Sequence, residues 1–137
     1  MSCLLDTSAC IALINQNPPA VSGRFDRALA QGEQIFVSVV AAFELWYGVA
    51  KSARKEANAK RVETFFAGPL TLLLFDEDDA QSAGRIRAAL ESAGKPINAY
   101  DVLVAGQALR HEFTLITANI REFRRVKGLV WEDWTRT

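Results

Sequence analysis

The chain of 137 residues has very few of the side chains on which several kinds of catalytic site depend. It contains one histidine, His111, which excludes a histidine acid–base pair or a zinc site with two or three histidines within one chain. Its two cysteines, Cys3 and Cys10, lack C-x-x-C spacing, so we expect reduced and buried thiols. Sixteen basic residues balance sixteen acidic ones, which argues against a protein that coats nucleic acid through bulk positive charge.

Long hydrophobic runs are also missing. Runs such as residues 70–75 are far shorter than the roughly 20 residues that cross a bilayer. The apolar start of the chain has no basic leading region and is interrupted by Asp6, which is unlike a signal peptide. We therefore expect a cytoplasmic protein with no membrane contact.

Half of the residues are hydrophobic, which is enough to build the core of one domain. Short apolar runs alternate with longer amphipathic segments, and this order is typical of an α/β domain. We expect a single domain over residues 1–137, with a mainly parallel sheet of four to five strands flanked by helices. The expected strands are 3–5, 35–38, 71–75, 114–117 and, more weakly, 129–131. The expected helices are 8–14, 21–31, 41–52, 54–66, 77–93 and 100–111.

Three separated carboxylates fall where such a fold would bind a ligand, beyond the carboxyl ends of its strands. Asp6 directly follows the first strand, and Glu44 lies one turn into the helix after the second. Asp101 begins a helix that is apolar nearly all round and therefore buried. Each also has a local explanation: a helix cap for Asp6, a solvated helix position for Glu44 and the helix dipole for Asp101.

Taken together, the three acids suggest a metal site. Crowded carboxylates repel one another unless a cation neutralises them, and an all-oxygen site suits Mg²⁺ or Mn²⁺. Such an ion serves phosphodiester hydrolysis. The acidic run at residues 76–79 has a different explanation, because consecutive helical residues point in different directions and a negative first turn is favoured at a helix start.

Four stretches of the chain carry motifs with a consistent order and spacing. They are LLDTSACIALI (4–14), SVVAAFELWYGVAKS (38–52), KPINAYDVLVAGQALRHEFTLITANIREF (95–123), which includes T-x-N-x-x-x-F, and VKGLVWEDW (126–134). On these motifs the chain resembles the PIN-domain ribonucleases, specifically the VapC toxins of bacterial toxin–antitoxin pairs. The resemblance covers nearly the whole chain.

The resemblance implies a Mg²⁺-dependent endoribonuclease that hydrolyses phosphodiester bonds in RNA, with Mn²⁺ able to replace Mg²⁺. Asp6, Glu44 and Asp101 match the metal ligands of the family. Asn119 matches a fourth catalytic position that is often acidic, and its neutral amide could orient water or a carboxylate. Transfer RNA is a target expected from the family, but no residue specifies it.

Further positions and partners follow from the same resemblance. Thr7 and Thr117 match polar positions that line the family's site, and Ser8 keeps a hydroxyl where asparagine is common. The implied partners are an RNA substrate, a VapB-like antitoxin that blocks the site, and a second toxin subunit in a homodimer and in toxin–antitoxin hetero-oligomers. DNA would be contacted only through the antitoxin.

Two surfaces are candidates for these partners. The segment 121–127 carries four basic residues and one acid close to Asn119, so Arg121, Arg124 and Arg125 are candidate RNA contacts. The segment 51–61, with five basic residues and one acid, is a weaker candidate. The helix of Glu44 carries more bulky apolar residues than its core-facing side can hold. We expect an antitoxin or dimer interface at three of them: Leu45, Trp46 and Tyr47.

Two alternatives remain open from the residues. A phospho-acceptor receiver domain is also a small α/β protein, but it needs an adjacent acid pair near its start, where Asp6 stands alone. The other alternative is a PIN module that binds without catalysis, which the three retained acids disfavour.

Overall fold

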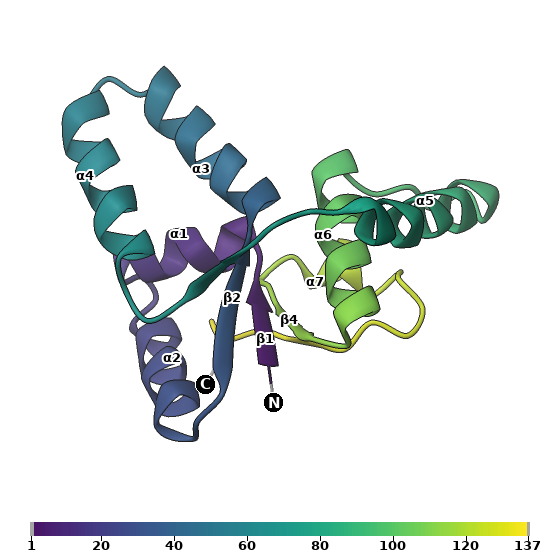
Figure 1. The fold of residues 1–137 in the computed structure, drawn as a ribbon, viewed down its shortest axis with the longest axis horizontal. Coiled ribbons are helices and arrows are strands. Elements are labelled where there is room, and N and C mark those ends of the chain that lie inside the picture. The colour runs from purple at the N-terminus through teal and green to yellow at the C-terminus, as the bar shows by residue number, and fades with distance from the viewer. Residues whose placement is uncertain (1, 137) are drawn as a thin grey trace.

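The structure is a computed structural model and describes residues 2–136. Within that range five parallel strands form one sheet in the order β3-β2-β1-β4-β5, with seven helices around it (Figure 1). The strands are β1 (Ser2–Leu5), β2 (Gln34–Ser38), β3 (Thr71–Leu73), β4 (Thr114–Ile116) and β5 (Trp131–Glu132). The helices are α1 (Thr7–Asn15), α2 (Pro19–Ala30), α3 (Val39–Lys51), α4 (Lys55–Phe66), α5 (Glu77–Ser92), α6 (Ala99–His111) and α7 (Ile120–Phe123). The prediction of an α/β fold on a parallel sheet is confirmed.

The differences from the sequence-based expectation are local. The last strand pairs at Trp131–Glu132 rather than at 129–131, and the third ends at Leu73 rather than at residue 75. The four-residue helix α7 was not predicted, because so short a helix shows no hydrophobic period. Helix α2 begins at Pro19, two residues early, since proline is well suited to a first helical turn.

The two faces of the sheet bury two separate cores. Along β1, Cys3 and Leu5 point into the core beneath α1–α4, while Leu4 points into the core beneath α5 and α6. This alternation follows from the pleat of a strand. Figure 1 shows the two helical layers on either side of the sheet, with α3 and α4 projecting from it as a hairpin. Both cysteines are buried free thiols, as expected.

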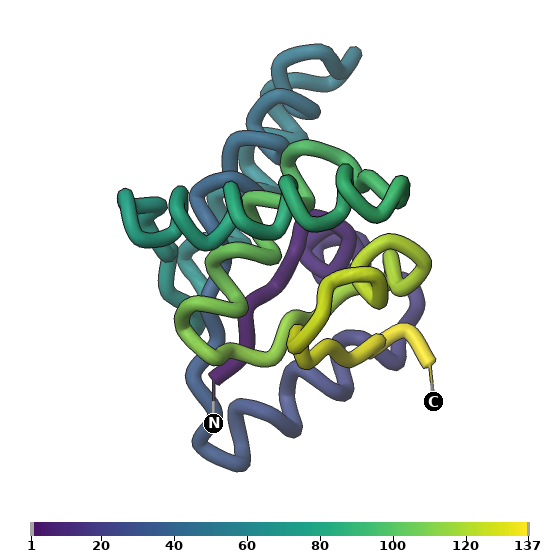
Figure 2. The backbone as a smooth tube through the Cα atoms, turned by 90° about the vertical axis from the view of Figure 1, so that its right-hand side faces the viewer, coloured from purple at the N-terminus to yellow at the C-terminus, as the bar shows by residue number. Residues whose placement is uncertain are grey.

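The second helical layer depends on close packing between α5 and α6. Figure 2 shows α5 running across α6, with the segment after α7 on the same side of the molecule. Where the helices meet, a Cβ on Gly106 would lie 2.7 Å from atoms of Ala83, so only glycine allows this approach. Among residues 2–136, none of the helices has both the length and the apolar character needed to cross a membrane.

Candidate active site

Asp6 lies at the point where the order of the strands in the sheet reverses. From β1 the chain adds β2 and then β3 on one side, and it later adds β4 and β5 on the other side. Ligands of open parallel sheets bind at such a switch point, beyond the carboxyl ends of the strands. Asp6 directly follows β1 and Thr117 directly follows β4. The hydroxyl of Thr117 donates a hydrogen bond to Oδ2 of Asp6 at 2.5 Å. These side chains therefore join the ends of the two strands.

The carboxylate of Asp6 is buried and is held by hydrogen bonds on both oxygens. Its Oδ1 accepts from the hydroxyl of Ser8 at 2.6 Å and from the backbone N–H of Ala9 at 2.9 Å, so Asp6 caps α1. Desolvation by burial raises the pKa of Asp6; the hydrogen bonds from Ser8, Thr117 and Ala9 oppose that rise, and the charge of Glu44 adds to it. The local cap and the candidate catalytic position are therefore the same residue.

Glu44 comes to this point from α3. Its Oε1 accepts a hydrogen bond from the hydroxyl of Thr7 at 2.6 Å, across the contact between α3 and α1. Thr7 is the first residue of α1 and follows Asp6 directly. Thr7 therefore fixes the carboxylate of Glu44 beside the end of β1.

Asp101 lies in the first turn of α6 and forms a cluster with Asn119 and Glu122. The amide nitrogen of Asn119 donates to Oδ2 of Asp101 at 3.1 Å and to Oε2 of Glu122 at 2.6 Å. The two carboxyl groups also hydrogen-bond to each other. The two acids are therefore close enough that the protonation of one depends on that of the other.

This interaction shifts the pKa values of the two acids in opposite directions. Desolvation raises the pKa of Asp101 to about 7, with further rises from the hydrogen bond and charge of Glu122 and from the charges of Asp6 and Glu44. The pKa of Glu122 is lowered, chiefly by the hydrogen bonds from Asp101 and from Asn119. Four acids from distant parts of the chain thus act on one another electrostatically at one end of the sheet.

The acids are near one another without being gathered into a ligand cluster. Among residues 2–136, no three His, Cys, Asp or Glu side chains stand in an arrangement that could hold a metal ion. Each carboxylate is instead held by its own donors: Ser8 and Thr117 for Asp6, Thr7 for Glu44. The donor set itself, all oxygen and mutually repulsive, has the chemistry that a hard divalent cation requires.

Glu122 is the residue of this site that sequence analysis missed. The signal was its spacing of three from Asn119, which places both side chains on one face of a helix. A spacing of three residues brings side chains together only in a helix, and no helix was expected at residues 120–123. Thr117 has a further role, since its oxygen accepts a hydrogen bond from the backbone N–H of Asn119 at 2.8 Å and so holds the turn into α7.

The candidate binding residues lie around this site. Arg121 and Arg124 are exposed on α7 and just after it, and neither forms an ion pair with another residue in the range 2–136. Arg125 is anchored, because its guanidinium donates to the carbonyl oxygen of Pro96 at 3.0 Å.

The expected interface on α3 needs one correction. Leu45 is only 7% exposed and packs in the core beneath α1–α4, so it cannot supply contact area. Trp46 and Tyr47 are exposed, by 39% and 58%. Phe43, also on α3, is 52% exposed and contacts the ring of Tyr100 at 5.5 Å between centroids, which widens this aromatic patch to α6.

Residues 3–129 match the PIN domain family. Curated relatives extend over almost the full chain. One is the tRNA(fMet)-specific endonuclease VapC of Shigella flexneri, 39% identical over 96% of this chain and 97% of that protein. Another is ribonuclease VapC2 of Rickettsia felis, 34% identical over 97% of this chain and 98% of that protein. This match rules out the receiver-domain alternative.

Solved structures agree in fold. VapBC2 from Rickettsia felis, bound to a DNA fragment from its promoter, superposes with a TM-score of 0.91 at 33% identity over 98% of this chain and 99% of that one. DNA-bound VapBC from Salmonella typhimurium gives a TM-score of 0.89 at 35% identity, with 98% of both chains covered. PIN-domain ribonucleases generally depend on a divalent metal. The chain therefore belongs to the PIN-domain family and, within it, to the VapC ribonucleases of toxin–antitoxin systems.

Proposed function

We propose that the protein is a Mg²⁺-dependent endoribonuclease whose catalytic residues are Asp6, Glu44, Asp101 and Asn119, joined by Glu122. The observation that carries this proposal is that Asp6, Glu44 and Asp101 come from distant segments to the switch point of the sheet, where neighbouring side chains hold their carboxylates. Anionic groups forced together in this way favour a cation among them.

Asp6, Glu44 and Asp101 would hold the metal ion. Their oxygen ligands suit Mg²⁺, and Mn²⁺ has the same preference and would replace it. When bound, the ion would polarise the phosphate and make a water molecule more acidic. Asn119 is neutral and would orient Asp101 and Glu122 rather than bind a second ion.

The residues of the chain would then act on the phosphate and on the proton. A water oxygen attacks phosphorus, the bond from phosphorus to the 3′ oxygen breaks, and the products carry a 5′-phosphate and a 3′-hydroxyl. Glu122 is not among the three proposed metal ligands and its pKa is lowered, so its carboxylate would accept the proton of the attacking water, while a second water molecule would supply the proton of the 3′-hydroxyl. Thr7, Ser8 and Thr117 position the carboxylates that they contact.

The binding surfaces follow from the same proposal. Arg121 and Arg124 would contact RNA phosphates beside the acids, as exposed cations do in most nucleic-acid complexes. The aromatic patch of Phe43, Trp46, Tyr47 and Tyr100 would bind a VapB-like antitoxin or a second copy of the chain, with DNA contacted only through the antitoxin. An RNA substrate, transfer RNA among the candidates, places this activity in the cytoplasm.

The test is conservative removal of each charge. Asp6→Asn, Glu44→Gln and Asp101→Asn should each lower Mg²⁺-dependent cleavage of RNA by about 100-fold or more, because each removes a ligand or a proton carrier. The purified variants should keep the circular dichroism spectrum of the wild type. Cleavage is measured on labelled RNA with and without EDTA.

Asp26→Asn is the matched control, since Asp26 is exposed on α2, in the other helical layer. It should cleave as the wild type does. Full activity in any of the three acid variants would remove that residue from the catalytic machinery. A wild-type chain that binds RNA but never cleaves it would instead favour the non-catalytic PIN module.

A further inference from the structure

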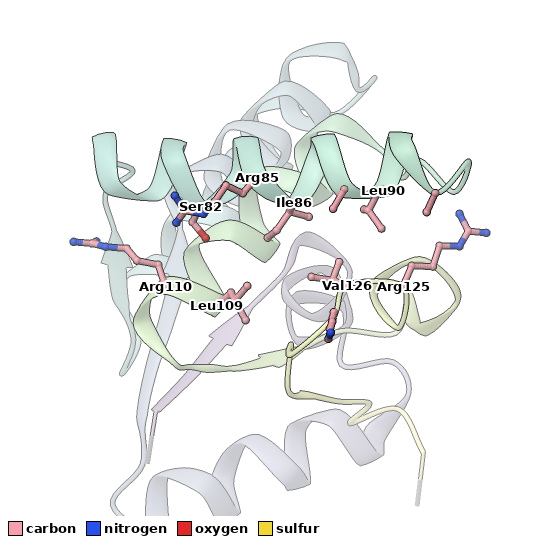
Figure 3. Close-up of a pocket in the computed structure, with 11 residues that line it drawn as sticks. Ser82, Arg85, Ile86, Leu90, Leu109, Arg110, Arg125 and Val126 are labelled. Atoms are coloured by element: carbon pink, nitrogen blue, oxygen red, sulfur yellow. The ribbon is translucent and has the colours of Figure 1, made fainter.

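A groove lies on the outer side of the second helical layer, between α5, the end of α6 and the segment after α7. Its volume is about 500 Å³. Figure 3 shows side chains from all three segments pointing into or along it. None of the acids of the candidate active site lines it, so the proposed catalytic function leaves this groove unexplained.

The floor of the groove is aliphatic. Ile86 and Leu90 reach it from α5, Leu109 from α6 and Val126 from the segment after α7. Three of these four are buried in the core, so the floor is a fixed surface that does not depend on flexible side chains. Such a floor can pack against the flat face of an apolar or weakly polar group.

The rim of the groove is positive. Arg85, Arg110, Arg125 and Lys127 line it, and no acidic residue does. Arg110 is already paired with the acidic start of α5. Within residues 2–136 the other three form no ion pair, which leaves three cations for an anionic ligand.

The groove also adjoins the acid site. Arg125 lines the groove, and its charge acts on Glu122, which accepts from the same Asn119 amide as Asp101 does. Arg121 and Arg124 lie between the two places along the chain, on α7 and just beyond it. The short segment 121–127 therefore carries cations both beside the acids and at the groove.

We propose that this groove is a second RNA subsite, which binds a nucleotide other than the one cleaved. The base would pack on the aliphatic floor, and neighbouring phosphates would contact Arg85, Arg125 and Lys127. Three unpaired cations without an acid among the lining residues favour a polyanion over a protein segment as the occupant. The inference rests on the proposed ribonuclease function and adds to it a substrate contact away from the reacting phosphate.

The test measures RNA affinity apart from cleavage. Arg85→Glu, Lys127→Glu and Ala89→Trp, which fills the groove from an exposed position, are titrated in EDTA against a labelled single-stranded RNA of about 12 nucleotides. Each should weaken binding about tenfold at moderate salt. The two charge variants should also lower the salt slope by about 0.7 for each lost phosphate contact, whereas Ala89→Trp should leave it nearly the same. In cleavage assays KM should rise much more than kcat falls.

Arg27→Glu on α2 is the matched charge control, since it reverses an exposed arginine in the other helical layer. Affinities and salt slopes equal to this control would overturn the inference. So would variants that lose binding of the antitoxin while RNA affinity stays intact, because the groove would then be a protein interface. If the wild type and Arg27→Glu bind RNA but do not cleave it with Mg²⁺, the proposed function fails while the subsite is still measurable by binding.

Discussion

At the scale of single residues, the site is defined by how burial and neighbours change the acidity of its carboxyl groups. Asp101 shows this most clearly, with a pKa of about 7 that comes first from desolvation and then from Glu122. An aspartate that titrates near neutrality can exchange a proton at the pH of the cell, which an ordinary aspartate cannot. The same feature makes the folded protein sensitive to pH.

We predict that this sensitivity appears in the metal-free protein. The folded state keeps the proton of Asp101 up to about pH 7, whereas the unfolded chain releases it near pH 4. Stability should therefore fall as pH rises from about 4 to 7, and the loss should be complete above the folded pKa. Asp101→Asn cannot ionise, so in EDTA at pH 8 it should be more stable than the wild type by roughly 1–2 kcal/mol after allowance for solvent screening of this half-buried group.

Urea unfolding of both proteins between pH 4 and 8 measures this difference, which should shrink toward pH 4. Asp6 and Glu122 are present in both proteins, so the pH dependence of the difference comes from the charge of Asp101 and from its interaction with these two acids. Asp26→Asn should follow the wild type at every pH. A constant gap between wild type and Asp101→Asn would contradict the prediction, because a pH-independent effect has no titration behind it.

Residues also differ in how far the sequence alone could place them. Asp6 and Asp101 were recognisable because each adjoins a segment whose apolar pattern is easily read, and Glu44 because its neighbours are apolar. Glu122 was not, because its role depends on Asn119 and Asp101, and the helix that aligns them is one turn long. Leu45 was predicted to lie on a surface, but it is buried. The size of a side chain does not indicate whether it faces the core or the solvent side of its helix.

At the scale of elements, α5 shows how a charged run becomes structural. Asp76 and Asp79 form a capping box, each accepting from the backbone N–H of the other at 3.0 Å. This confirms the prediction that residues 76–79 form a helix start. Only the fold adds that Asp79 is fully buried and accepts a hydrogen bond from Arg110 of α6 at 3.2 Å.

We predict that replacing two neighbouring acids of α5 by alanine lowers the free energy of unfolding by unequal amounts. Asp79→Ala should lower the free energy of unfolding by about 1–3 kcal/mol, because it removes half of the capping box of α5 and a buried carboxylate that accepts from Arg110. Asp78→Ala should cost much less, since Asp78 is exposed and its pair with Arg110 is screened by water. Chemical unfolding gives both values, and equal losses would show that Asp79 acts only as a surface charge.

At the scale of the whole molecule, the zero net charge hides an uneven surface. Acids are gathered at the end of the sheet and at the start of α5, while unpaired cations lie along α7 and around the groove. The aromatic patch of Phe43, Trp46, Tyr47 and Tyr100 lies across α3 and α6, beside Glu44 and Asp101 in the sequence. A protein that assembles over this patch would stand next to the proposed active site.

We predict that Tyr47→Glu weakens such assembly, because it places a charge in the patch without touching the core. Light scattering after gel filtration should show loss of the dimer for the chain alone, or loss of the complex when the antitoxin is present. Leu74→Glu, at a residue that is 71% exposed near β3, is the matched control and should assemble as the wild type does. If Tyr47→Glu keeps both assemblies, the patch is not an interface.

The sequence by itself determined the fold class and the order of the main elements, and it pointed to three acids of the candidate site, because these depend on local patterns of hydrophobicity and on residues at the ends of strands. Only the tertiary structure decided which groups meet. The amide of Asn119 contacts Asp101, the hydroxyl of Thr117 contacts Asp6, and the cationic groove is built from three segments, so each joins parts that are distant along the chain. Hydrogen bonds and Coulomb forces act over a few ångströms in space, and no pattern along a single sequence contains those distances.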